Sequence, residues 1–256
     1  MVFADRHRML ADYVGGGTDP EDPTRILAMP IVLRIEKATP PPRRGLLEAA
    51  ARAAVLLCLD ERVDVDPDSA VPGPWHEPVH SWMDARIRKI SRRARGAGWV
   101  AAQEVWGVTV DTGAAAARAI VPCPVGEVDR RIAKLQISGT EVDGDLSGAS
   151  AGDAEDLTLW VNPGLSMTVG KLAAQVGHAA MLAVGLYDPD EAYRWWVAGA
   201  PLQVTMAEPD HWRRLSAADP ATVAVVRDAG YTEVAPGSTT VIARRRDLTD
   251  LDRLSR

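Results

Sequence analysis

The strongest constraint on the fold of this chain is one stretch of its second half, LTLWVNPGLSMTVGKLAAQVGHAAMLAVGL, from Leu157 to Leu186. Its apolar start, Leu157 to Val161, predicts a buried strand, and the turn residues Asn162 to Gly164 end that strand. A helix can begin at Ser166 to Thr168. From Gly170 the residues are almost all Ala, Leu, Val, Met and Gly, which is typical of a helix buried on most sides.

Three polar side chains interrupt this apolar helix. Lys171, Gln175 and His178 are spaced i, i+4, i+7, so they fall within about 60° of one another on one face. In one interpretation this face meets solvent, with Lys171 reaching out to water and His178 bonded to a neighbouring carbonyl. In the other, the strand end, turn and helix start present Lys171 at the rim of a sheet, where α/β proteins usually bind ligands.

A second segment, VAVVRDAGYTEVAPGSTTVIAR, runs from Val223 to Arg244. It predicts a strand that ends at Arg227 to Gly230, a loop with Thr232, and a second strand from Thr239 to Ala243.

The pairing of GKLAAQVGHAA with DAGYTEVAPGSTTV at this separation resembles the type II peptidyl-tRNA hydrolase family. The resemblance extends from Leu157 to Arg246. Its most specific parts are Gly170-Lys171, the Ala-Ala-Gln that precedes His178-Ala179, and the run with Asp-Ala-Gly, Thr232 and Pro-Gly. It implies an α/β fold with a mixed four-stranded sheet flanked by helices.

The resemblance also implies an activity, the hydrolysis of the ester that joins a peptide to the ribose at the 3′ end of tRNA. Lys171 matches the family's catalytic lysine, and Gln175 matches the glutamine one turn along. Asp228, Thr232 and Thr240 match its aspartate and its two threonines. We therefore expect these residues to form the site.

These residue types suit ester hydrolysis, which needs a positioned water, a group that takes its proton, and donors aimed at the developing oxyanion. Asp228 can orient or deprotonate the water, with Thr232 helping to hold it. Lys171 can stabilise the oxyanion or the charge on the leaving ribose oxygen. His178 is a further catalytic candidate, although a histidine that faces an Ala-rich interior is more often a core residue.

The chain departs from the family pattern where the family would meet tRNA. Asn162 and Gly164 stand where members usually carry Arg and Asp, and Thr168-Val169 stands where they tend to have a small basic loop. Tyr231-Thr232-Glu233 replaces the common Arg followed by Thr-Gln. Each change removes positive or amide character, so we expect weaker tRNA binding around an intact catalytic centre.

Composition excludes several classes of protein. No run approaches the ~18 apolar residues of a membrane span, and the N-terminus lacks the apolar core of a signal peptide, so we expect a cytoplasmic protein with no membrane partner. Cys58 and Cys123 have no metal-type spacing and read as reduced packing residues. The formal net charge of -6 argues against nonspecific nucleic-acid binding, so a tRNA ligand would need a local basic patch.

The first half of the chain contains the same order of predicted elements as the second. A strand at Ile31–Ile35 precedes a Pro-rich turn and a helical run from Leu46 to Leu59, and a shift of 126 aligns these with the strand and helix that follow Leu157. A degenerate internal repeat without the lysine and Asp-Ala-Gly signals explains this pattern. Alternatively, two α/β halves look alike because they share common parts. Because type II hydrolases are typically dimers, an inactive copy could occupy the partner's place as a pseudo-dimer within one chain, and a homodimer is the other arrangement.

The sequence His76-Glu77-Pro78-Val79-His80 matches the HExxH pattern of zinc peptidases. Pro78 is incompatible with the helix interior that this metal site needs, so we expect Pro78 in the first turn of a helix and no metal.

That helix is predicted to continue to about Arg95 with a basic face. The basic residues are Arg86, Arg88, Lys89, Arg92, Arg93 and Arg95. Such a run is either a solvated face or the surface that binds tRNA phosphates.

The predicted organisation follows from these segments. Residues 1–29 form a weakly ordered lead-in, 30–137 an α/β module that ends in a short helix, 138–156 a Gly/Ser/Asp-rich linker, 157–246 the hydrolase-like domain and 247–256 a charged tail. We expect a peptidyl-tRNA hydrolase without a cofactor. The alternative is a catalytically inactive RNA-binding or protein-interaction protein on the same fold.

Overall fold

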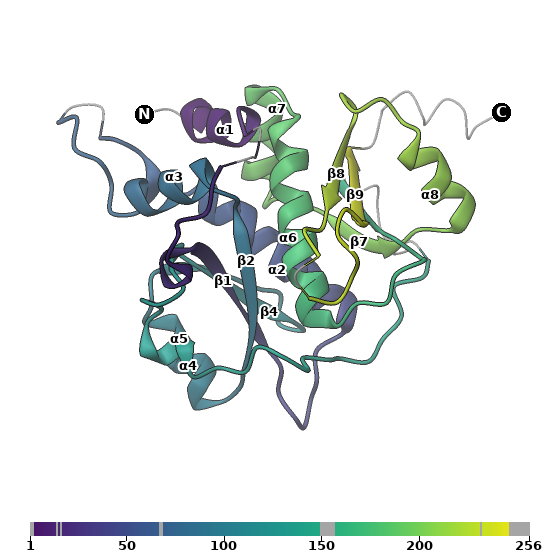
Figure 1. Cartoon of the computed structure of the whole chain (residues 1–256), viewed down its shortest axis with the longest axis horizontal. Coiled ribbons are helices and arrows are strands. Elements are labelled where there is room, and N and C mark those ends of the chain that lie inside the picture. The colour runs from purple at the N-terminus through teal and green to yellow at the C-terminus, as the bar shows by residue number, and fades with distance from the viewer. Residues whose placement is uncertain are drawn as a thin grey trace.

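The computed structural model describes residues 3–13, 15, 17–66, 69–148, 157–230 and 232–245. These residues form an α/β molecule with two mixed sheets and two long helices packed between them (Figure 1). The helices are α1 (Phe3–Ala11), η1 (Pro23–Arg25), α2 (Arg43–Cys58), η2 (Glu61–Val63), α3 (His76–Asp84), α4 (Ala97–Gln103), α5 (Arg130–Ala133), α6 (Val169–Gly185), α7 (Pro189–Val197) and α8 (Pro209–Ser216). The strands are β1 (Leu27–Arg34), β2 (Arg88–Ala94), β3 (Gly107–Asp111), β4 (Ala116–Ile120), β5 (Cys123–Pro124), β6 (Leu157–Val161), β7 (Gln203–Met206), β8 (Val223–Arg227) and β9 (Thr239–Arg245).

The C-terminal sheet has the order β7-β6-β9-β8. β7 runs parallel to β6, and β9 is antiparallel to both β6 and β8. β6 is the apolar strand expected at residues 157–161, and α6 is the helix expected after it. The predicted mixed four-stranded sheet flanked by helices is therefore confirmed.

The N-terminal sheet has the same arrangement, with the order β2-β1-β4-β3. β2 runs parallel to β1, and β4 is antiparallel to both β1 and β3, while the short β5 pairs with the start of β1. In both halves the first strand is followed by a long helix and a shorter one, then by the parallel strand, a further helix and the final antiparallel pair. The two halves therefore share strand order, strand direction and helix placement.

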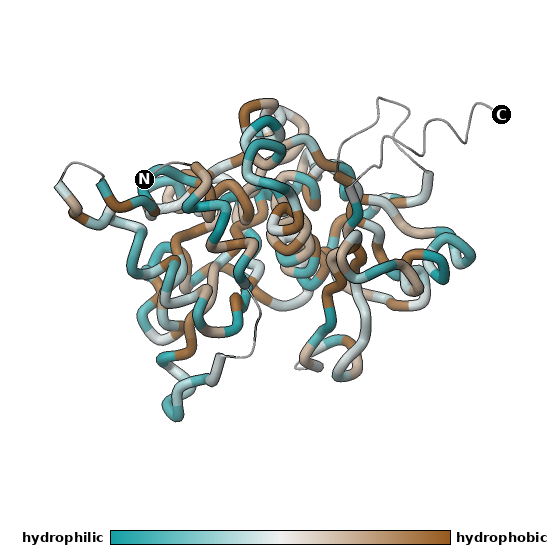
Figure 2. The backbone as a smooth tube through the Cα atoms, turned by 90° about the horizontal axis from the view of Figure 1, so that it is seen from above, coloured by the Kyte–Doolittle hydropathy of each residue, from teal (hydrophilic) through white to brown (hydrophobic). Residues whose placement is uncertain are grey.

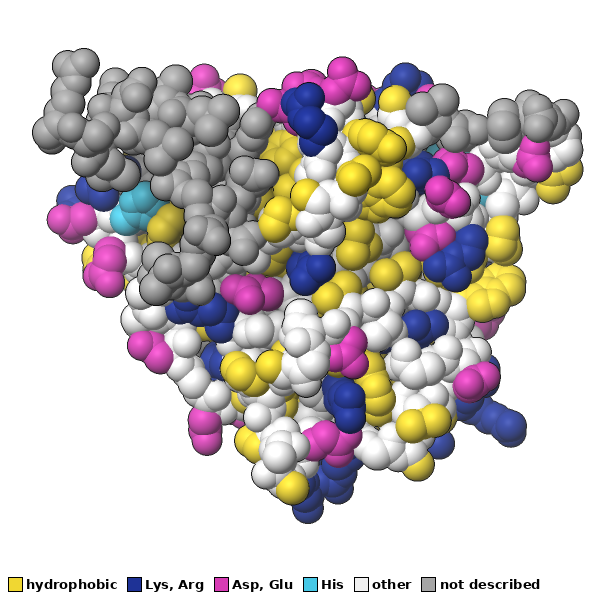
Figure 3. Space-filling view, turned by 180° about the vertical axis from the view of Figure 1, so that it is seen from behind, with side chains coloured by type: hydrophobic (Ala, Val, Ile, Leu, Met, Phe, Trp, Pro, Cys, Tyr) yellow, Lys and Arg dark blue, Asp and Glu magenta, His cyan; other side chains and the backbone are white. Residues whose placement is uncertain are grey.

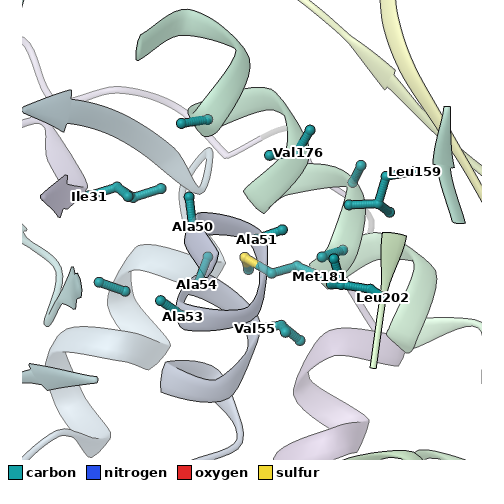
Figure 4. Close-up of a cluster of buried hydrophobic side chains, with 14 of the residues drawn as sticks. Ile31, Ala50, Ala51, Ala53, Ala54, Val55, Leu159, Val176, Met181 and Leu202 are labelled. Atoms are coloured by element: carbon teal, nitrogen blue, oxygen red, sulfur yellow. The ribbon is translucent and has the colours of Figure 1, made fainter. Parts of the chain in front are cut away.

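The hydrophobic core is continuous between the halves because α2 and α6 pack against each other (Figure 4). Ile31 of the first sheet and Leu159 of the second both belong to this core. Small residues allow the close approach, since a Cβ on Gly177 would lie only 3.2 Å from Cβ of Ala54. Figure 2 shows hydrophobic stretches through the middle of the molecule and hydrophilic ones mostly at its periphery. No described helix has both the length and the apolar character needed to cross a membrane.

The N-terminal residues differ from the expected weakly ordered lead-in. α1 is a regular helix that packs on α6 and α7, with Phe3 and Leu10 buried. His7 fixes its position, because its Nε2 lies 2.8 Å from the carbonyl oxygen of Val184. Contacts with the other half order this segment, and such contacts have no local sequence signal.

The predicted helix through Arg95 is wrong beyond Asp84. α3 ends there, Ile87 adopts a positive φ of 40°, and residues 88–94 form the edge strand β2. Ile87, Ile90 and Ala94 have helical spacing in the sequence, but pairing with β1 overrides this local pattern. The short helix expected at the end of the 30–137 module is the four-residue α5.

The segment expected to be a linker packs against both halves as far as the structure describes it. Thr140, Val142 and Leu146 are buried, and the Leu146 carbonyl accepts a hydrogen bond of 2.9 Å from the backbone N–H of Met206. Arg44 donates to the carbonyls of residues 146–148. The rest of this segment, 149–156, and the predicted tail, 247–256, lie outside the described residues, and the domain boundaries stay predictions.

Candidate active site

An ion pair lies where the first turns of α6 meet the end of β8. The Nζ of Lys171 lies 2.5 Å from Oδ2 of Asp228, and the side chains are 12% and 7% exposed. α6 places the lysine, and the residue that follows β8 places the carboxylate. Because both groups are mostly removed from water, their attraction is screened less than that of a surface pair.

Two further side chains complete a hydrogen-bonded network. The buried Thr240 hydroxyl donates to Oε1 of Gln175 at 2.5 Å, and Nε2 of Gln175 donates to Oδ2 of Asp228 at 3.0 Å. A hydroxyl that donates to the amide oxygen leaves the amide NH₂ to face the carboxylate. Thr240 therefore fixes the orientation of Gln175, and Asp228 receives a neutral donor beside the charged one.

The loop between β8 and β9 holds the Asp228 carboxylate through its backbone. The N–H of Gly230 donates to Oδ1 of Asp228 at 2.8 Å. The Asp228 N–H donates to the Ser238 carbonyl at 2.9 Å, and the Gly237 N–H donates to the Asp228 carbonyl at 2.7 Å. Gly230 has φ of 81°, and a Cβ there would lie 2.4 Å from Cγ of Pro236. This turn explains why glycine stands two residues after the aspartate.

The start of α6 borders the site. Thr168 is the N-cap, because its Oγ1 accepts the backbone N–H of Lys171 at 3.2 Å. The Glu233 carboxylate accepts hydrogen bonds from the backbone N–H and hydroxyl of Thr168, at 2.8 and 2.7 Å. No local sequence pattern indicates this contact with Glu233, although a threonine just before an apolar helix is a capping signal. Thr232 is exposed on the same loop, and its neighbour Tyr231 lies outside the described residues.

Together these residues supply the groups that hydrolysis of an ester requires. Asp228 is a carboxylate held by donors on both oxygens, and Lys171 is a cationic donor beside it. The pair is mostly but not fully buried. Nowhere in the described part of the chain do three His, Cys, Asp or Glu residues come together in a way that could hold a metal ion.

His178 lies outside this network. It projects toward the N-terminal half, where burial and the nearby Lys89 charge lower its pKa well below the ordinary value. Lys89 itself donates to the Ile87 carbonyl at 3.1 Å and lies 4.9 Å from the Trp82 ring. Burial lowers the pKa of Lys89 to about 7. The structure therefore places His178 in the contact between the halves, as a neutral imidazole at neutral pH.

The basic run does not form one face. Arg92 is buried and donates to the carbonyls of Ala133 and Leu135, and the Lys89 amine points inward. Arg88 pairs with Asp19, and Arg93 donates to Gln136. Arg86 and Arg95 are exposed, but Arg86 also contacts Gly17 and Asp19. Figure 3 shows basic and acidic side chains interspersed on the face opposite to that of Figure 1.

The HExxH segment forms the first turns of α3, with Pro78 in the first turn as expected. Nδ1 of His76 lies 2.8 Å from the Val63 carbonyl oxygen, and the His76 and His80 ring centroids are 4.1 Å apart. His76 is thus committed to a backbone contact.

The N-terminal half has small residues at the matching positions. Lys171 and Gln175 are the third and seventh residues of α6, and the third and seventh residues of α2 are Gly45 and Ala49. A Cβ on Gly45 would lie 3.4 Å from Cβ of Ala115. No equivalent of the charged network is present among these described residues.

Comparison with known proteins connects this geometry to a family. Residues 156–247 match the family model described as peptidyl-tRNA hydrolase PTH2. The chain is 33% identical over 119 residues to peptidyl-tRNA hydrolase 2, mitochondrial, of Homo sapiens. The aligned segment covers 43% of this chain and 66% of that protein. It is 35% identical over 97 residues to a peptidyl-tRNA hydrolase of Haloquadratum walsbyi, covering 36% of this chain and 86% of that protein. A probable peptidyl-tRNA hydrolase 2 of Schizosaccharomyces pombe is 35% identical over 93 residues, covering 34% of this chain and 45% of its own length. The chain thus spans slightly less than two thirds of the human relative and less than half of the yeast one.

Proposed function

Because this chain belongs to the peptidyl-tRNA hydrolase PTH2 family through residues 156–247, we propose that it hydrolyses the ester between a peptide and the 3′-terminal ribose of tRNA. The observation that supports this most strongly is the network of Lys171, Gln175, Asp228 and Thr240. All four residues lie in the matched region, and they supply a base and a cationic donor with some access to solvent.

In the proposed reaction a water attacks the ester carbonyl carbon while the Asp228 carboxylate takes the water proton. The new C–O bond places negative charge on the carbonyl oxygen, which the Lys171 ammonium stabilises. When the bond to the ribose oxygen breaks, Lys171 gives that oxygen a proton, so the products are a peptide carboxylic acid and a free 3′ end. The hydrogen bond between the two side chains then returns the proton from Asp228 to Lys171.

The supporting residues have positioning roles in this proposal. Gln175, oriented by Thr240, keeps Asp228 in place while Lys171 turns toward the substrate. Thr232, exposed on the same loop, helps to hold the water. His178 takes no part, since it faces the other half of the molecule.

The alternative function is a catalytically inactive RNA-binding or protein-interaction protein. The observation that favours it is the negative Glu233 at the start of α6, where the family commonly carries an amide. The predicted role of the basic run in binding tRNA stays a prediction, of which the exposed Arg95 is the residue best placed to meet a phosphate. The cytoplasmic location also stays a prediction.

We further propose that the N-terminal half is a degenerate copy of the C-terminal fold that occupies the place of a second subunit. The shared topology, the small residues Gly45 and Ala49 at the matching positions, and the packing of α2 on α6 support this. The arrangement predicts a monomer of 27.5 kDa in solution by light scattering. A stable homodimer at micromolar concentration would contradict it.

The experiment that tests the activity is release of the acyl group from an N-acetylated aminoacyl-tRNA by the purified full-length protein. We expect release by the wild type and a loss of about a hundredfold or more in Lys171→Ala. An exposed lysine or arginine far from the site, such as Arg213, provides the matched control as Arg213→Ala. Binding of tRNA without release would favour the inactive binding protein.

A further inference from the structure

The active-site network joins two segments that are distant in the sequence. α6 contributes Lys171 and Gln175, whereas Asp228 and Thr232 belong to the loop that connects β8 to β9. Backbone hydrogen bonds between Asp228, Gly237 and Ser238 close the base of this loop. These bonds do not fix the middle of the loop, which needs a separate contact.

Glu233 supplies that contact. Its Oε2 accepts the backbone N–H of Thr168 at 2.8 Å, and its Oε1 accepts the Thr168 hydroxyl at 2.7 Å. Among the described residues of the loop between 229 and 237, Glu233 is the one that hydrogen-bonds to the segment that begins α6. Val234, next to it, packs on the hydrophobic core. The loop is therefore fixed at its middle as well as at its base.

The electrostatics of the helix favour this contact. The first N–H groups of α6 lack partners within the helix, and the start of a 17-residue helix carries partial positive charge. A carboxylate that accepts two hydrogen bonds there is stabilised. The Thr168 hydroxyl, which donates to Glu233, also accepts the backbone N–H of Lys171 at 3.2 Å. Glu233 is thus connected through one residue to the turn that carries the lysine.

We propose that Glu233 is a positioning residue, which holds the loop bearing Asp228 and Thr232 against the helix bearing Lys171 and Gln175. The inference rests on the proposed hydrolysis for its kinetic consequence, but the contact itself is independent of any activity. The glutamate also adds a negative charge beside the start of α6. Its hydrogen bonds hold the site together, whereas its charge repels an RNA substrate.

Two variants separate these effects. Glu233→Ala removes both acceptors, and we expect kcat to fall about fivefold or more with a smaller change in KM. Glu233→Gln keeps one acceptor oxygen and removes the charge, so we expect kcat within about threefold of the wild type and a lower KM for N-acetylated aminoacyl-tRNA. The matched control is Glu208→Ala, because Glu208 is the N-cap of α8 and makes no side-chain hydrogen bond to it.

Amide hydrogen exchange of the full-length protein provides a readout that does not need activity. We expect Glu233→Ala to increase exchange in residues 165–172 and 232–238, while Glu208→Ala leaves both segments unchanged. Unchanged exchange and unchanged kcat in Glu233→Ala would overturn the proposal, and so would a kcat in Glu233→Gln as low as in Glu233→Ala. If the wild type does not hydrolyse the substrate, the proposed function fails, and exchange alone then decides whether Glu233 holds the loop.

Discussion

Replacing Thr240 with valine tests the geometry of the network through one hydroxyl. Thr240 is fully buried, and its hydroxyl donates to Oε1 of Gln175 at 2.5 Å. Valine has nearly the same shape, so the substitution leaves no cavity. It leaves the amide oxygen of Gln175, which is 8% exposed, without this donor.

The expected cost follows from that change. A buried polar atom left without its partner costs about 1–3 kcal/mol. In a chain of this size each kcal/mol lowers the melting temperature by about 2–4 °C, so we expect a decrease of about 2–12 °C. Gln175 also loses the bond that orients its NH₂ toward Asp228, so we expect a lower rate of hydrolysis as well.

Urea unfolding followed by circular dichroism measures the free energy of unfolding. The matched control is Thr239→Val, because Thr239 precedes Thr240 on the same strand, is partly exposed and makes no described side-chain hydrogen bond. We expect the control to stay within about 0.5 kcal/mol of the wild type. Equal stability of the two variants would refute the Thr240–Gln175 bond and the orientation assigned to Gln175.

Three further predictions concern other parts of the molecule. Burial in the folded protein lowers the pKa of Lys89 to about 7. Between pH 7 and the ordinary pKa of lysine, the unfolded chain therefore binds more protons than the folded protein. The contribution of Lys89 to the free energy of unfolding thus rises as the pH rises from 7 to 10. Lys89→Met should therefore raise the melting temperature most at pH 7 and progressively less toward pH 9, and an equal difference at all pH values would contradict the burial of the amine. Gly230→Ala should lower hydrolysis by about tenfold or more, because the Pro236 ring leaves no room for a Cβ in the turn that holds Asp228. Gly237→Ala has a similar strained positive φ but open space for its Cβ, so it should lower hydrolysis less. Arg95→Ala should weaken tRNA binding and reduce its salt dependence if the basic run meets phosphates, which fluorescence anisotropy in a salt series measures. Arg92→Ala should instead lower the free energy of unfolding, which urea unfolding measures.

The sequence predicts the C-terminal half well, because there local pattern and tertiary structure agree. An apolar run, a turn and an apolar helix are found where expected. Lys171 and Gln175 draw attention because polar residues at i and i+4 of a buried helix are unusual, and the resemblance to the peptidyl-tRNA hydrolase family is what predicts them as site residues. His178 lies on the same helical face, but it contacts the N-terminal half instead of Asp228, because one face of a long helix can meet two different neighbours.

The parts that the sequence did not predict depend on contacts between distant residues. Residues 88–94 have helical spacing, but pairing with β1 makes them a strand. α1 and the segment at 140–146 are ordered by the opposite half. Glu233 lies 65 residues from Thr168, so no local pattern indicates that its carboxylate caps α6. Tertiary contact decides each of these cases.

The central claim is that Lys171 and Asp228 act as one catalytic unit on the ester of peptidyl-tRNA. The most direct measurement is the single-turnover rate of acyl release from N-acetylated aminoacyl-tRNA for Lys171→Ala, Asp228→Ala and the double variant, each with its fold verified by circular dichroism. We expect each single variant to lose about a hundredfold or more and the double variant to be no slower than the slower single one, because residues that act together are not additive. Full activity in either single variant, or losses that multiply in the double variant, would contradict the account.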